Sequence, residues 1–85
     1  MCTYIVEKVS TEGSGKGPDG WFAVTDTTVS YDHPVHASAE HTLNIDFLNP
    51  GKGASARVAV ELTAQSAREL IAAIQRTLEQ VPPGL

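Results

Sequence analysis

The residues with the greatest chemical potential are concentrated in one short segment, residues 31–41, which holds every histidine of the chain. Five side chains in this segment could bind a metal ion or move a proton: Asp32, His33, His36, Glu40 and His41. Neutral imidazole carries a lone pair and is the commonest metal-binding side chain of proteins. A His-x2-His-x4-His spacing on a loop that enters a strand can direct two or three ring nitrogens at one ion. We therefore predict a site for divalent zinc, iron or copper with the three histidines as ligands.

Two further positions extend this prediction. Cys2 follows the initiator Met, and removal of that Met would place an α-amine beside the thiol, so Cys2 is predicted as a fourth ligand. Glu40 is predicted as a catalytic base or as a group that orients a ligand. Asp46 is a second candidate catalytic carboxylate, with Asn44 two residues before it on the same strand face. The alternatives are histidines that are merely solvated, and histidines that move protons without a metal.

The elements that must position these side chains are four strands and one helix. Strands are predicted over residues 3–10, 21–31, 41–48 and 56–62, where β-branched and aromatic residues alternate with polar ones. The apolar positions of the second strand change from even to odd numbers, which predicts a bulge or twist near residues 26–28. Thr63 is a predicted helix N-cap, and apolar residues at helical spacing predict a helix over residues 64–80.

Residues 13–20 hold four glycines and one proline and are predicted to form a flexible loop. A phosphate-binding loop is excluded because the segment lacks a Gly-Lys-Ser/Thr ending and precedes a strand rather than a helix.

The elements predict an α+β fold, ββββα, in which one C-terminal helix packs on one face of a four-stranded antiparallel sheet. Its apolar face carries four predicted core residues, Leu43, Ile45, Val58 and Val60. His41 is in phase with Leu43 and is therefore expected on the helix side, so the three histidines need not form one site. On this reasoning His33 and His36, both on the loop, are the firmer pair.

Length and composition limit the partners. Eighty-five residues predict a single domain over residues 1–85, small enough that homodimerisation is the expected way to bury more surface. A net charge of −4 with scattered Lys and Arg argues against nucleic acid or an anionic membrane as partner. A single cysteine excludes an intramolecular disulfide. No apolar run reaches the roughly 18 residues that span a bilayer, and no secretory signal is visible, which predicts a cytoplasmic protein.

Four motifs carry a resemblance over nearly the whole chain: Met-Cys-Thr-Tyr (1–4), Gly-Ser-Gly-Lys-Gly-Pro-Asp-Gly-Trp-Phe (13–22), Tyr-Asp-His-Pro-x-His-Ala (31–37) and Glu-His-x-Leu-Asn-Ile-Asp-Phe (40–47). With them the chain resembles a family of short, uncharacterised actinobacterial proteins, and the resemblance implies a bacterial origin and no particular substrate. Three functions follow from the residues themselves. The first is a small metal-binding protein or metal-dependent enzyme. The second is a metal-free enzyme or accessory factor of a biosynthetic pathway that binds a small molecule on the open sheet face. The third is a dimeric interaction module without catalysis.

Overall fold

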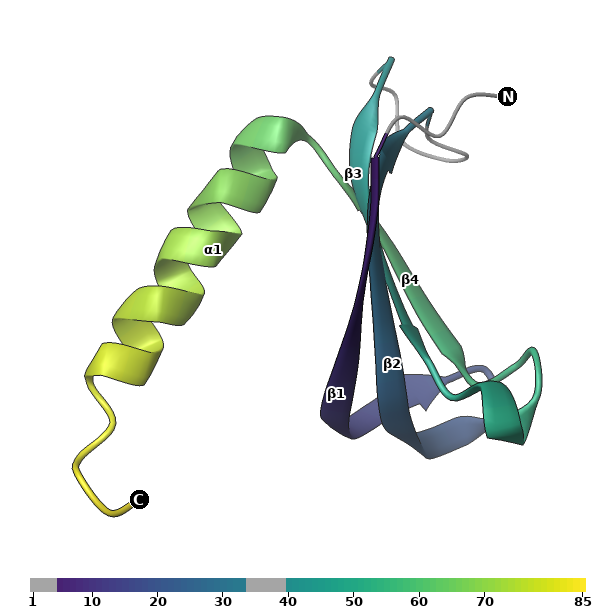
Figure 1. Cartoon of the computed structure of the whole chain (residues 1–85), viewed down its shortest axis with the longest axis horizontal. Coiled ribbons are helices and arrows are strands. Elements are labelled where there is room, and N and C mark those ends of the chain that lie inside the picture. The colour runs from purple at the N-terminus through teal and green to yellow at the C-terminus, as the bar shows by residue number, and fades with distance from the viewer. Residues whose placement is uncertain (1–4, 34–39) are drawn as a thin grey trace.

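The computed structural model describes residues 5–33 and 40–85, which form one antiparallel sheet and one helix (Figure 1). Its strands lie in the order in which they occur in the chain: β1 (Ile5–Gly17), β2 (Gly20–Asp32), β3 (Thr42–Leu48) and β4 (Arg57–Leu62). A short 3-10 turn, Pro50–Lys52, joins β3 to β4, and helix α1 (Ala64–Glu79) ends the fold. The predicted α+β architecture, ββββα, is confirmed.

The side of the sheet toward α1 is apolar because the strand register aligns apolar positions. Leu43, Ile45 and Phe47 of β3 lie opposite Leu62, Val60 and Val58 of β4. Val29 and Tyr31 of β2 pair with Ile45 and Leu43 on the other side of β3. Successive side chains of a strand point to opposite faces, so the polar residues between them lie on the other side.

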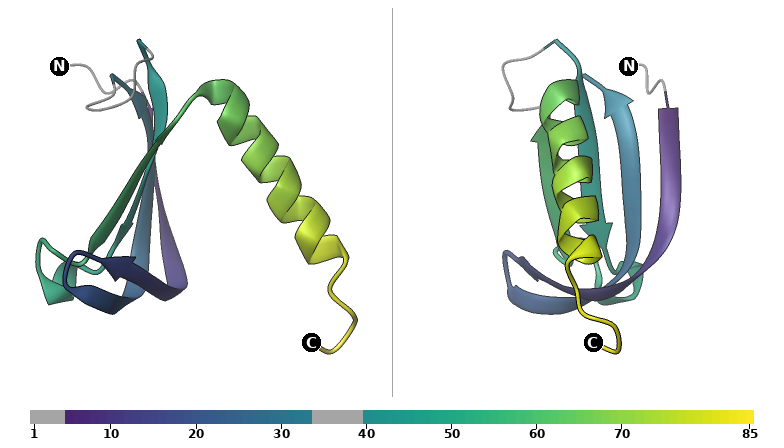
Figure 2. Two further views of the ribbon diagram at one scale, coloured as in Figure 1. Left: turned by 180° about the vertical axis from the view of Figure 1, so that it is seen from behind. Right: turned by 90° about the vertical axis from the view of Figure 1, so that its left-hand side faces the viewer.

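The glycine-rich segment is largely a strand, and the predicted loop over residues 13–20 is wrong. Gly13 pairs with Val24 and Gly17 with Gly20, which leaves only Pro18 and Asp19 as the turn between β1 and β2. The tip of this long hairpin bends across the sheet (Figure 2). A Cβ on Gly17 would lie 2.9 Å from the carbonyl oxygen of Ser55, just before β4. Gly17 is therefore where another part of the backbone passes too close for a side chain.

The irregularity predicted for β2 is present, but the extra residue lies in β1. The register shifts between Ser10 and Gly13, which pair with Asp26 and Val24. The inward-facing residues of β2 have even numbers on one side of this bulge and odd numbers on the other. Val24 lines a pocket with Phe47, and Val29 lines a pocket with Ile45. The bulge thus bends the hairpin while Val24 and Val29 both stay on its inner side.

Helix α1 starts as predicted and then diverges from the sheet. The Thr63 hydroxyl oxygen accepts a hydrogen bond from the backbone N–H of Ser66 at 3.1 Å, and the helix ends at Glu79, one residue short of the predicted end. The helix leans outward, so its inner face covers the sheet incompletely (Figures 1 and 2). Over residues 5–33 and 40–85, only two apolar side chains, Val24 and Ala56, are buried. Within the same ranges no helix is long and apolar enough to cross a bilayer.

Candidate functional site

The ends of β2 and β3 bring His33 and His41 together. Asp32 pairs with Thr42 at the end of the ladder, and the two histidines flank this last pair. Their ring centroids lie 4.6 Å apart with the planes tilted by 31°. Strand phase left open whether His41 joins the loop histidines in one site, and the structure places its ring beside that of His33. Cys2 and His36 lie outside the described residues.

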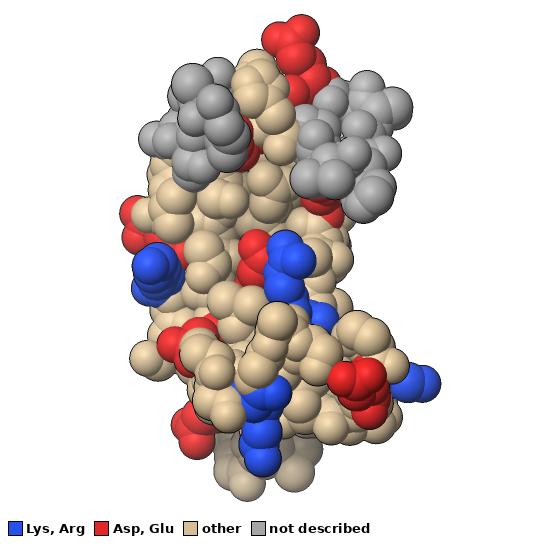
Figure 3. Space-filling model, turned by 90° about the vertical axis from the view of Figure 1, so that its right-hand side faces the viewer, with Lys and Arg blue, Asp and Glu red and all other residues tan. Residues whose placement is uncertain are grey.

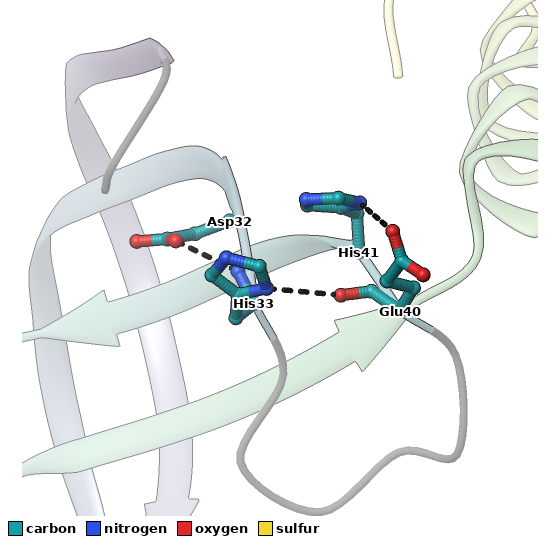
Figure 4. A network of polar contacts seen from close by, with 4 residues as sticks. All are labelled: Asp32, His33, Glu40 and His41. Atoms are coloured by element: carbon teal, nitrogen blue, oxygen red, sulfur yellow. Dashed lines mark hydrogen bonds and ion pairs between the residues drawn. The ribbon is translucent and has the colours of Figure 1, made fainter. Parts of the chain in front are cut away.

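Glu40 contacts both imidazoles (Figure 4). Nδ1 of His33 lies 3.2 Å from the backbone carbonyl oxygen of Glu40, and Nδ1 of His41 lies 3.8 Å from its carboxylate. A carbonyl oxygen only accepts hydrogen bonds, so this contact favours the tautomer of His33 with its proton on Nδ1 and its lone pair on Nε2. The Glu40 side chain is 89% exposed, which makes its ion pair with His41 weak.

Tyr31 extends the pair into a row of three rings. The Tyr31 and His41 rings are stacked, with centroids 5.9 Å apart and planes 16° from parallel. Nε2 of His41 is buried. We call Tyr31, His41 and His33 the ring row. It lies on the α1 side of the sheet, as the phase of His41 with Leu43 predicts.

The opposite side of the same strand ends is polar and closely bonded. Asp32 is buried, and its carboxylate accepts a hydrogen bond from the backbone N–H of His33 at 2.7 Å. Thr42 is fully buried, and its hydroxyl donates to the side-chain oxygen of Asn44 at 2.6 Å. Each of these bonds is local to one strand end, directly beside a histidine.

Asp46, a predicted catalytic carboxylate, lies in a different environment. Its carboxylate binds the guanidinium of Arg57, 2.7 Å from Nη2 and 2.9 Å from Nε. Asp46 alternates with the inward-facing Ile45 and Phe47, so it lies on the face away from α1 and away from the ring row. Basic and acidic side chains are interspersed on that face, as Figure 3 shows. Asp46 therefore lies apart from the ring row and forms a cross-strand ion pair with Arg57.

An apolar groove of about 540 Å³ opens between α1 and the sheet. Most of its lining comes from β2, β3 and the inner face of α1, and includes Tyr31, Leu43, Ile45, Ala67, Ile71 and Ile74. Two charged side chains, Glu7 and Arg68, also line it. Tyr31 belongs both to the groove and to the ring row, so His41, which is stacked on Tyr31, is one ring removed from the groove lining. Within residues 5–33 and 40–85, no group of three His, Cys, Asp or Glu side chains is placed to hold a metal ion.

Comparison with known proteins identifies the family. A sequence model of a family of unknown function, DUF6295, matches residues 1–85. The chain belongs to DUF6295. No curated protein and no solved structure matches it. The match spans the whole DUF6295 chain, so the ring row, the groove and α1 all lie within the family's domain.

Sequence reasoning found the histidines of this DUF6295 protein but missed the groove. It assigned the apolar stripe of α1 to a closed core and placed a small-molecule site on the opposite face, near Asn44 and Asp46. One signal was present in the sequence. The stripe is wide, since five apolar residues (Ala67, Leu70, Ile71, Ile74 and Leu78) recur within three turns, while the strand residues available to cover it are few.

Proposed function

We propose that the protein binds an apolar small organic molecule in the groove between α1 and the sheet, with the ring row as the polar end of the site. The observation that carries the proposal is a groove of about 540 Å³ whose lining is mostly apolar and includes Tyr31, on which the His41 imidazole is stacked. Ligand sites of proteins are typically about 300–1,000 Å³, mostly apolar, with a few polar groups that fix orientation.

The lining also defines the ligand chemistry. Leu43, Ile45 and Ile71 offer a surface for hydrocarbon or aromatic groups. Tyr31, whose ring is stacked on the His41 imidazole, offers an aromatic surface and a hydroxyl group at one end of the groove. An apolar molecule with one hydrogen-bonding end fits this arrangement. An imidazole at that end is also the group best suited to moving a proton near neutral pH, with Glu40 beside it as the carboxylate partner.

Filling the groove tests the proposal. Ala67 lines the groove from α1, and Ala67→Trp is expected to weaken binding of an apolar aromatic probe, anilinonaphthalene sulfonate, by about tenfold or more, because the indole occupies the space of the ligand. Ala59→Trp is the matched control, since Ala59 is exposed and pairs with Asp46 on the other face. Probe fluorescence measures both, with circular dichroism to confirm that each variant is folded. Equal affinity of the two variants would contradict a ligand site in the groove.

A second function, metal binding, is favoured by the geometry of the two described histidines. The contact of His33 Nδ1 with a backbone carbonyl is the support that metal-binding histidines usually have, and it leaves the lone pair on Nε2. Under this hypothesis His33 and His41 bind zinc, iron or copper, with His36 and Cys2 as the remaining ligands. It ranks second because the planes of the two rings are tilted by only 31°, so that one or both rings must rotate before their nitrogen lone pairs meet at one ion.

Metal content decides this second hypothesis. Elemental analysis of protein reconstituted with zinc, iron or copper and then desalted is expected to give about one equivalent for the unaltered chain, because specific sites bind tightly. The variant His33→Ala with His41→Ala is expected to retain under about a tenth of that amount. His36→Ala tests the histidine outside the described residues. Metal retention by the double variant, or no retention by the unaltered chain, would exclude a site at these histidines.

A further inference from the structure

The protein exposes far more surface than its mass predicts. A folded monomer of 9.0 kDa is expected to expose about 4,800 Å², whereas this chain exposes 6332 Å². Its radius of gyration is 14.4 Å, whereas a compact chain of this length is expected to have about 12 Å. The excess of about 1,500 Å² exceeds the roughly 800 Å² that each partner buries in an interface of standard size. There is thus enough uncovered surface for a stable interface.

Much of the uncovered apolar surface lies along α1. Ile71 is 56% exposed, Ile74 50% and Leu78 65%, and Leu70 and Val81 are also exposed. These residues recur every three or four positions and form one continuous stripe. Ile71 and Ile74 line the groove, whereas Leu78 lies beyond it. A small molecule in the groove would therefore leave Leu78 uncovered, whereas the surface of a second protein chain is large enough to cover the whole stripe.

Two charged residues, Arg68 and Glu79, flank this stripe at positions that suit pairing with a second copy of the chain. Arg68 and Glu79 are eleven residues, or about three turns, apart, so both lie on the same side of α1. Arg68 borders the apolar groove. In an antiparallel pair of helices related by a two-fold axis, each flank of one helix faces the same flank of the other. The N-terminal end of each helix then lies beside the C-terminal end of its partner. Arg68 of one helix then meets Glu79 of the other, twice. Neither residue forms an ion pair within residues 5–33 and 40–85.

We propose that a second copy of this chain covers the exposed stripe, the two α1 helices lying side by side and antiparallel across the open side of the groove. The two-fold axis passes level with residues 73 and 74, midway between Arg68 and Glu79. A parallel pair would instead place the Arg68 flank against the opposite flank, which carries the uncharged Ser66 and Thr77. The antiparallel pair is thus the one that the charges select. The proposed dimer does not depend on a ligand, because Leu78, which lies beyond the groove, is exposed whether or not the groove is filled.

Charge reversal tests this arrangement. In sedimentation equilibrium the unaltered full chain is expected to have twice its 9.0 kDa mass. Arg68→Glu is expected to weaken self-association by about tenfold, because it replaces two attractive contacts per dimer with two repulsive ones. Glu79→Arg is expected to do the same. The double variant, Arg68→Glu with Glu79→Arg, is expected to restore the affinity because each pair is rebuilt with its charges exchanged.

Arg76→Glu is the matched control, since it makes the same change of charge on the outer side of α1, opposite the apolar stripe. It is expected to leave the dissociation constant within about twofold of the unaltered chain. Three outcomes would overturn the proposal: a monomer at all concentrations for the unaltered chain, no recovery in the double variant, or an equal effect of Arg76→Glu and Arg68→Glu. Probe binding in the groove is measured on the same samples, so loss of the dimer and loss of the ligand site are distinguished.

Discussion

Replacing Ile74 with Glu is expected to convert the proposed dimer to a monomer. Ile74 lies in the middle of the exposed stripe of α1, level with the proposed two-fold axis, and is 50% exposed in the single chain. At that position its side chain would face the partner helix, and a carboxylate there would lose its hydration without gaining a counter-charge. Because the interface is symmetric, the substitution acts twice in each dimer.

We therefore expect the dissociation constant of the Ile74→Glu variant to rise by about a hundredfold or more. The midpoint of thermal unfolding should also lose its dependence on protein concentration, since that dependence comes from association. Ala72→Glu is the matched control: it adds the same charge two residues earlier, on the far side of α1 from Ile74. Sedimentation equilibrium and thermal unfolding at several concentrations measure both variants. Equal dissociation constants for the two would rule out the stripe as the interface.

The architecture was predictable from the sequence because its signals are local. Period-two alternation in residues 41–48 and the cap at Thr63 depend on neighbours in the chain, and both are found in the structure. The angle of α1 to the sheet was not predictable. The spacing of Leu70, Ile74 and Leu78 shows which side of the helix is apolar, but it does not show whether the chain's own sheet or a second copy covers that side.

The candidate site was predictable only in part, for the same reason. The clustering of three histidines gave the location, and strand phase correctly placed His41 on the side of α1. Phase could not show that His33 and His41 adjoin, because that depends on how the strands β2 and β3 are paired. Ion pairing with Arg57, eleven residues away on β4, could not be foreseen for Asp46 either.

The glycine-rich segment shows how an accurate rule gave a wrong structure. Glycine weakens a strand, so four glycines in residues 13–20 favoured a loop. The rule holds for an isolated strand. Here the tip of the β1–β2 hairpin crosses β4, and the two backbones can approach each other closely only at a position without a side chain. A Cβ on Gly15 would lie 3.1 Å from Cγ2 of Val24, and one on Gly17 would be closer still to backbone. Glycine is needed there because of a contact about forty residues away in the sequence, which no local pattern contains.

Gly17→Val is therefore expected to be one of the most damaging single substitutions in the protein. The new Cβ would lie 2.9 Å from the carbonyl oxygen of Ser55, 3.4 Å from that of Arg57 and 3.2 Å from the ring of Phe22. Two of these neighbours are backbone, which cannot move aside as the end of a flexible side chain can, so the hairpin tip must separate from β4. We expect a loss of about 3 kcal/mol in the free energy of unfolding, a large part of the stability of a domain this small.

Gly13→Val provides the matched control, because it makes the same substitution in the same strand where a Cβ would meet nothing within 4 Å. Valine favours strands, so this variant is expected to remain within about 0.5 kcal/mol of the unaltered protein or to be slightly more stable. Urea unfolding followed by circular dichroism, at one protein concentration for all three chains, measures both differences. If β1 and β4 do not meet, the two valines will have the same effect. A large loss at residue 17 alone requires that the glycine segment is a packed strand rather than the flexible loop that its composition suggests.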